Sequence, residues 1–232
     1  MFDHSIFFPF MGNILTPHTT SSFLKHFQQI GHNLGFAHSG EAQAYDDQTG
    51  MMGYSYSNSN GPIMCFNGAK SWQTRWYTDK ETKVGASTGN DAACFEGQLH
   101  GIANYDDASA SMVLIKIEGN SGNDHYIAYN RKDGINSGTV EGGNTVTVTS
   151  RPTGETSYGE SDLLAKMSAG TVTGPYGPDN LMVRFNSVTT TNGIQSANVI
   201  ISATGNIGSC SSNVSLDTIS SRISFGIDNH FI

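Results

Sequence analysis

Two histidines lie six residues apart in the segment FQQIGHNLGFAHSG, residues 27–40, and a glycine lies between them. They are His32 and His38, with Gly35 between them and Gln28 four residues before His32. Imidazole nitrogens and, more weakly, amide oxygens bind divalent cations. The order ligand-x-x-x-His-x-x-Gly-x-x-His is the spacing of a zinc site on a helix that is followed by a sharp turn. We therefore expect a zinc site formed by Gln28, His32 and His38.

A helix must carry the first two of these ligands, because residues i and i+4 lie on one helix face. The residues from 19 to 34 predict that helix. Hydroxyl side chains at positions 19–22 are N-cap candidates, and Gly35 is a natural C-terminal stop. Helical spacing predicts one buried apolar face formed by Phe23, Phe27, Ile30 and Leu34.

Several separate blocks carry a family resemblance: IGHNLGFAHSGE, DDQTGMMGYSYS, MCFNGAKSWQTRWY and GINSGTVEGGNTVTV. Together, from roughly Phe23 to Ser202, the chain resembles the gametolysin family of metzincin zinc metallopeptidases. These are secreted proteases that act on algal cell-wall and matrix glycoproteins. The resemblance implies a zinc cofactor, a protein or glycoprotein substrate of the cell wall or extracellular matrix, and an extracellular or cell-wall location.

The resemblance also implies a role for each matching residue. His32, His38 and Gln28 correspond to the zinc ligands, and Gly35 to the glycine of the turn. Met52 corresponds to the methionine of the Met-turn beneath the metal. Tyr54, two residues later, is a possible further ligand. The loop acids Glu41, Asp46 and Asp47 are additional groups that could approach the site.

Gln29 is the main departure from the family pattern, because it occupies the position of the general-base glutamate. An amide cannot take a proton from the attacking water, and general acid–base help contributes about 10²- to 10⁴-fold to the rate. One interpretation is therefore a zinc endopeptidase with impaired activity. The alternative is an inactive pseudopeptidase that serves as an extracellular glycoprotein- or polysaccharide-binding module.

The predicted fold class is α+β. We expect a truncated metzincin-like catalytic portion in residues 1–90, with a zinc helix, a Met-turn and a C-terminal helix at residues 65–80. An antiparallel β-sandwich in residues 95–205 and a polar, mobile tail in residues 206–232 follow. Six β-rich runs, separated by Gly, Asn, Asp and Pro, predict the sandwich strands: 111–118, 125–130, 145–149, 162–167, 181–187 and 197–202.

About 20 residues precede the expected zinc helix, which is too few for the upper subdomain of a metzincin. We therefore expect the helix to expose an apolar flank, in a protease that has lost its front half or in a fragment of a longer protein. The amino terminus has an acid at Asp3 and no Lys or Arg before Lys25, so it is a poor signal peptide.

The composition limits the partners. A formal net charge of −8 argues against nucleic acid, and no apolar run of about 18 residues predicts a membrane span. The three cysteines leave two alternatives open. A Cys65–Cys94 bridge with Cys210 unpaired would suit an oxidising compartment, and three free thiols would suit the cytosol.

Overall fold

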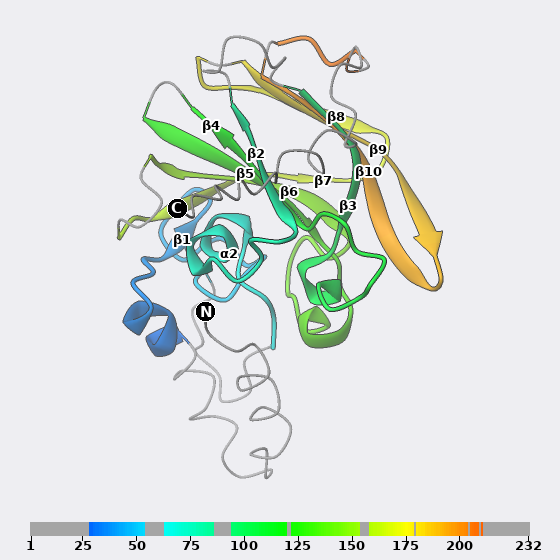
Figure 1. Cartoon of the computed structure of the whole chain (residues 1–232). Coiled ribbons are helices and arrows are strands. Elements are labelled where there is room, and N and C mark those ends of the chain that lie inside the picture. The colour runs from blue at the N-terminus through cyan, green and yellow to red at the C-terminus, as the bar shows by residue number, and fades with distance from the viewer. Residues whose placement is uncertain are drawn as a thin grey trace, which may run out of the picture.

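The chain forms a mostly β structure of the α+β class. Its computed structural model describes residues 28–53, 63–85, 94–119, 122–153, 158–178, 180–203, 205–208 and 210. Two packed sheets dominate these residues, and the helix α2 (Gly68–Thr74) covers the outer face of the larger sheet (Figure 1). Short 3-10 helices occur at Ile102–Asn104 and Gly134–Asn136.

The larger sheet has six strands in the order β1-β7-β6-β5-β4-β2. Their bounds are β1 Ser39–Gly40, β2 Glu81–Gly85, β4 Leu114–Glu118, β5 Asn123–Asn130, β6 Thr145–Pro152 and β7 Ser161–Met167. The central strands β4 to β7 pair in antiparallel fashion, whereas the edge pairs β1/β7 and β2/β4 are parallel. Strands from both sides of residue 90 therefore belong to one sheet.

The smaller sheet has four antiparallel strands in the order β3-β10-β9-β8. Their bounds are β3 Cys94–His100, β8 Thr171–Tyr176, β9 Leu181–Thr191 and β10 Ile194–Ser202. All six β-rich runs of the sequence are thus confirmed as strands. The strands β1, β2, β3 and β8 were not predicted, because they are very short, polar, or interrupted by glycine or proline.

The core follows from the two-residue period of the strands. Ile115 and Ile117 on β4, and Ile127 on β5, are buried against residues of the smaller sheet such as Val183 and Phe185. Burying one such side chain contributes about 1.5–3 kcal/mol. Intervening residues of β4 and β5 form a second cluster with α2: Leu114, Tyr126, Ala128, Ala69 and Trp72.

Helix α2 is shorter than the predicted helix at residues 65–80. The Asn67 side chain begins it by accepting a hydrogen bond from the backbone N–H of Lys70 at 2.9 Å. Arg75 ends it in the left-handed conformation, with φ 59°, and donates its N–H to Trp72. The predicted extent is wrong because these two caps confine the helix to seven residues.

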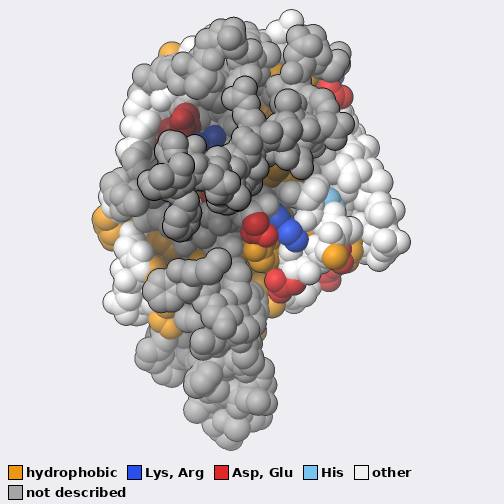
Figure 2. Space-filling model, in the orientation of Figure 1, with side chains coloured by type: hydrophobic (Ala, Val, Ile, Leu, Met, Phe, Trp, Pro, Cys, Tyr) orange, Lys and Arg blue, Asp and Glu red, His pale blue; other side chains and the backbone are white. Residues whose placement is uncertain are grey.

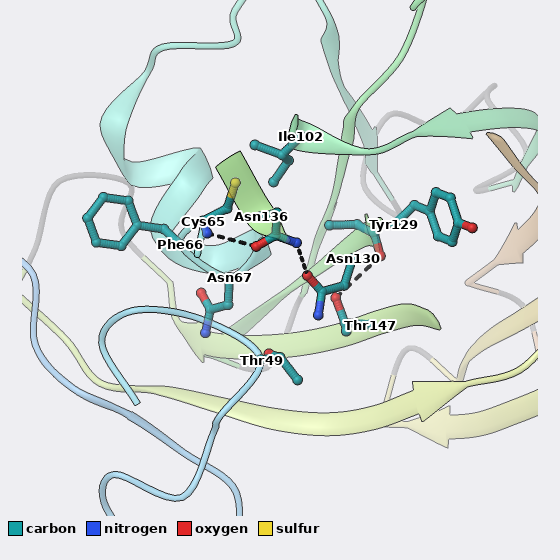
Figure 3. Close-up of a pocket in the computed structure, with 11 residues that line it drawn as sticks. Thr49, Cys65, Phe66, Asn67, Ile102, Tyr129, Asn130, Asn136 and Thr147 are labelled. Atoms are coloured by element: carbon teal, nitrogen blue, oxygen red, sulfur yellow. Dashed lines mark hydrogen bonds between the residues drawn. The ribbon is translucent and has the colours of Figure 1, made fainter. Parts of the chain in front are cut away.

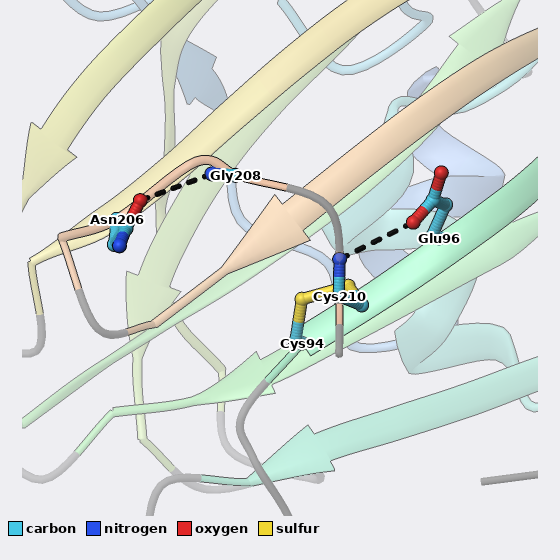
Figure 4. The surroundings of a disulfide bond; sticks show 5 residues. All are labelled: Cys94, Glu96, Asn206, Gly208 and Cys210. Atoms are coloured by element: carbon cyan, nitrogen blue, oxygen red, sulfur yellow. Dashed lines mark hydrogen bonds between the residues drawn. A yellow bond between two sulfur atoms is a disulfide. The ribbon is translucent and has the colours of Figure 1, made fainter. Parts of the chain in front are cut away.

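A disulfide joins Cys94 and Cys210, with a Cα–Cα distance of 5.8 Å, and Cys65 is free (Figure 4). Neither sequence interpretation, a Cys65–Cys94 bridge or three free thiols, is correct. Cys94 begins β3 opposite Ser202, the last residue of β10. The chain that leaves β10 therefore passes close to Cys94 at the start of β3. Cys65 lies beside α2, in another layer.

Several charged side chains of the described residues form ion pairs. Figure 2 shows red carboxylates next to blue basic groups on one face of the molecule. Lys166 forms ion pairs with Glu41 at 2.9 Å and with Glu141, and Lys116 pairs with Asp124 at 2.9 Å.

None of the helices in the described ranges combines the length and apolar character needed to cross a bilayer.

Candidate metal centre

The candidate site begins where a helix ends. Residues 28–33 are helical, and the N-terminal part of the helix predicted from residue 19 lies outside the described residues. The Phe36 N–H donates to the Gly31 carbonyl at 2.9 Å, and the Gly35 N–H donates to the His32 carbonyl at 2.9 Å. With Gly35 at φ 83°, these bonds form a Schellman motif, which reverses the chain immediately after the helix.

This reversal brings the two histidines together. The Nε2 atoms of His32 and His38 lie 3.1 Å apart, and the rings meet edge to face with centroids 4.7 Å apart. Two nitrogen ligands of one tetrahedral zinc ion are about 3.3 Å apart, given Zn–N distances of about 2.05 Å. The pair therefore fits the spacing that a shared zinc ion requires.

The backbone fixes the orientation of His32. Its Nδ1 lies 2.8 Å from the carbonyl oxygen of Phe36, so that Nδ1 carries the proton and donates it. In the neutral ring the lone pair is then on Nε2, the atom that faces His38. A carbonyl behind the ring in this way is the usual outer partner of a metal-binding histidine.

The surroundings of His38 disfavour its protonated form. Burial and the neighbouring His32 lower the pKa of His38, while the negative charge of Glu160 opposes that shift. The ring of Tyr45 covers His38, with centroids 3.9 Å apart. Protons therefore compete less with a cation for His38 than for an exposed histidine.

Strand pairing holds the backbone on both sides of His38. The Ser161 N–H donates to the His38 carbonyl at 3.1 Å, and the Ser39 N–H donates to the Met52 carbonyl at 3.1 Å. The hydroxyls of Ser39 and Ser161 lie 2.9 Å apart, and both are buried. The second histidine is thus fixed by β7, more than 120 residues later in the chain.

Met52 packs against the helix that carries His32. Its side chain is 1% exposed. A Cβ atom at Gly31 would overlap its Sδ and lie 3.2 Å from its Cε, so the thioether fills the space left by this glycine. Met52 therefore contacts the helix next to His32, and its carbonyl binds the residue next to His38.

A buried polar network supports this turn. Asp47 accepts hydrogen bonds from the backbone N–H of Thr49 at 3.0 Å and from the Asn67 amide at 2.7 Å. The same amide reaches the hydroxyls of Ser39 and Ser161 at 3.1 and 3.2 Å. Burial raises the pKa of Asp47, and its hydrogen bonds with Thr49 and Asn67 oppose that shift. The network connects the loop that carries Met52, the start of α2 and the start of β7.

Two of the three loop acids, Glu41 and Asp47, have structural partners. Glu41 binds Lys166, Asp47 lies in the buried network, and Asp46 is exposed. Within the described ranges, no set of three His, Cys, Asp or Glu residues is grouped to hold a metal ion. Gln28 is partly exposed on the helix, one turn before His32, and Gln29 is exposed. Tyr54 lies outside the described residues.

The expected buried face of the helix is wrong at its described end. Ile30 is 36% exposed and Leu34 is 46% exposed. The helix packs instead through Gly31, against Met52 and Phe36. Helical spacing identified the apolar stripe but not its partner.

A small polar pocket beside α2 shows how the later sequence block supports the site (Figure 3). It has room for about one water molecule. Asn136 on one side accepts from the Cys65 N–H at 2.8 Å and donates to the Asn130 side chain at 2.7 Å. Nearby, Thr139 donates to the Thr49 carbonyl at 3.4 Å. The GINSGTVEGGNTVTV block therefore contacts the loop that carries Met52.

The sequence did not single out two charged residues near the histidines. Lys70 is completely buried in α2, and its Nζ donates to the Gly159 carbonyl at 2.7 Å. Glu160 is the next residue and is exposed. The β1/β7 register brings Glu160 near His38, and the Gly159 carbonyl joins Lys70 to the same segment. No local sequence pattern signals these long-range contacts.

Comparisons of the chain with family models, curated proteins and solved structures find no match.

Proposed function

We propose that the protein is a gametolysin-like zinc endopeptidase of low activity that acts on proteins of the cell wall or extracellular matrix. The observation that carries this proposal is the 3.1 Å approach of the His32 and His38 Nε2 atoms across the turn at Gly35. The order of ligands, turn and methionine follows the family pattern. The Cys94–Cys210 disulfide supports a location outside the cytosol.

Each residue of the candidate site has its own role in this proposal. His32 and His38 would hold the zinc ion, with Gln28 as a weaker oxygen donor one turn before His32. When bound, zinc supplies Lewis acidity that polarises the scissile carbonyl and activates water. Phe36 orients His32 through its carbonyl, and Met52 supports the helix from below. These contacts preorganise the pair before a cation binds.

Gln29 explains why low activity is proposed. A side-chain amide neither accepts the proton of the attacking water nor delivers it to the leaving amine. A carboxylate on the helix, in Gln29→Glu, is expected to raise the cleavage rate. A zinc-loaded Gln29→Glu variant without chelator-sensitive cleavage would argue against a protease site.

The direct test is zinc binding by the full chain. Purified protein is expected to bind one equivalent of zinc and to cleave an unfolded protein substrate in a chelator-sensitive reaction. His38→Ala should lose both properties, whereas Gln43→Ala, at an exposed position on the following loop, should keep them. Wild-type protein that binds no zinc at micromolar concentrations would contradict the proposal.

A second candidate function is favoured by Gln29 itself. In this alternative the protein is an inactive pseudopeptidase whose β-sandwich binds extracellular glycoprotein or polysaccharide. Its expected result is binding of matrix glycoprotein or polysaccharide by both wild-type protein and His38→Ala, without cleavage by either. Chelator-sensitive proteolysis by wild-type protein alone would decide for the enzyme.

A further inference from the structure

We propose that Glu160 supplies the carboxylate that Gln29 lacks and acts as the general base of the site. This inference rests on the proposed endopeptidase function and adds a catalytic residue to it. Glu160 directly precedes β7, the strand that pairs with the two residues after His38.

The register of β1 and β7 places Glu160 beside His38. Ser39 and Ser161 are direct partners in this parallel pair, and their hydroxyls face each other at 2.9 Å. His38 and Glu160 each come one position earlier. Because side chains alternate along extended chains, both point away from the buried serine side and toward the same face. His32 meets His38 on that face.

A buried lysine fixes the backbone just before Glu160. The Lys70 Nζ donates to the Gly159 carbonyl at 2.7 Å, and the Lys70 side chain is completely buried. On the other side of Glu160, the Ser161 N–H is bound to the His38 carbonyl at 3.1 Å. Hydrogen bonds to both neighbours therefore fix the position of Glu160 relative to His38, although its side chain is exposed.

The charge of Glu160 acts on the groups around it. It raises the pKa of His38 against the lowering caused by burial and by His32. It also raises the pKa of Lys70, against the larger lowering by burial and Arg151. The β1/β7 register places Glu160 next to His38, and its exposure gives it access to water. A general base needs to reach the proton that it removes directly or through one water.

Glu160 would carry one proton from water to the leaving amine during peptide hydrolysis. Glu160 accepts a proton from the attacking water as the water oxygen bonds to the scissile carbonyl carbon. The carbon–nitrogen bond then breaks, and the proton on Glu160 passes to the departing amine. The products are a carboxylic acid and an amine, and Glu160 returns to its starting carboxylate state.

The test compares Glu160→Gln with Asp162→Asn, a matched control that removes another exposed carboxylate two residues later, in β7. Zinc affinity is measured by competition with a chromophoric chelator, and cleavage with an unfolded protein. A third measurement uses calorimetry in two buffers to count the protons released when a peptide hydroxamate binds to the zinc-loaded protein. This count does not depend on turnover.

The proposal expects Glu160→Gln to keep its zinc affinity within about threefold and to lose about 10²- to 10⁴-fold in cleavage rate. Wild type and Asp162→Asn should retain the hydroxamate proton on Glu160, whereas Glu160→Gln should release about one more proton per complex. Adding Gln29→Glu to Glu160→Gln should restore cleavage, which would show that the variant is folded.

Other results would overturn the inference. If Glu160→Gln matches wild type in rate and proton release while zinc binding persists, Glu160 is not the base, but the proposed function stands. A loss of zinc affinity above tenfold would make Glu160 a ligand instead of a base. If wild type binds neither zinc nor hydroxamate, the proposed function fails and this inference fails with it.

Discussion

Gly53 lies directly against the backbone of Asp47. A Cβ atom at Gly53 would overlap the Asp47 carbonyl oxygen and lie 2.6 Å from the carbonyl carbon. The glycine after Met52 thus allows this turn to pack closely on the preceding loop, where the Asp47 carboxylate is buried in the polar network.

Gly53→Ala is therefore expected to destabilise the protein, because backbone atoms cannot move aside as a flexible side chain can. The expected loss in unfolding free energy is about 1–3 kcal/mol, measured by urea denaturation. Gly208→Ala is the control, since its Cβ would meet only an ordinary contact at 3.5 Å, and it should change stability by less than about 0.5 kcal/mol. Equal effects of the two substitutions would contradict the close packing at Gly53.

Gly35 provides a test of backbone conformation alone. It has φ 83°, and no neighbouring atom lies within 4 Å of an added Cβ. Gly35→Ala is expected to cost about 1–2 kcal/mol, because alanine is strained in the left-handed region. Gly35→Asn should cost less, since asparagine tolerates this region. Urea denaturation measures the unfolding free energies of both variants. An asparagine variant less stable than the alanine variant would argue against the Schellman turn.

Lys70 is expected to make stability increase with pH. Burial, reinforced by the nearby positive charge of Arg151, lowers the pKa of Lys70 to about 7, whereas the amine in the unfolded chain titrates near 10.5. Between these values the unfolded chain holds a proton that the folded chain has lost. The unfolding free energy then rises with pH, by at most about 1.4 kcal/mol per pH unit.

The measurement compares urea denaturation of wild type and Lys70→Met at pH 6.5, 8 and 9.5. Wild type should gain stability relative to Lys70→Met as the pH rises, and the gain should disappear below about pH 7, where the amine is charged in both states. Lys132→Met, at an exposed lysine, should leave the wild-type pH dependence unchanged. Parallel curves for wild type and Lys70→Met would exclude a lowered pKa at Lys70.

The disulfide is expected to contribute to stability through the unfolded chain. It joins residues 116 positions apart, and closing such a loop stabilises proteins by about 2–4 kcal/mol. Replacing both Cys94 and Cys210 with serine should lower the unfolding free energy by about that amount. Reductant should weaken wild type but not the double variant. Thiol titration in denaturant should count one thiol before reduction, from Cys65, and three after it.

Local signals allowed the turn at the histidine pair to be predicted. His32, Gly35 and His38 lie within seven residues, and the preference of glycine for the left-handed region determines the reversal. The six strands found from the sequence also carry their signal locally, in β-branched and apolar residues. For such features the interacting groups are close in sequence.

The features that sequence reasoning missed depend on long-range contacts. Glu160 is brought beside His38 by the β1/β7 register, and Cys210 reaches Cys94 only because β10 pairs with β3. Ile30 and Leu34 have the period of a buried stripe, yet the helix packs through Gly31 instead. A helical period identifies an apolar stripe, but the tertiary structure decides what covers it.

The hydrogen bond from Ser161 to His38 also has a consequence for the order in which the molecule is made. A nascent chain leaving the ribosome contains both imidazoles long before β7 has been synthesised. The backbone of His38 therefore lacks this partner until most of the polypeptide has emerged. Synthesis from the amino terminus thus delays the attachment of His38 to β7 until late in translation.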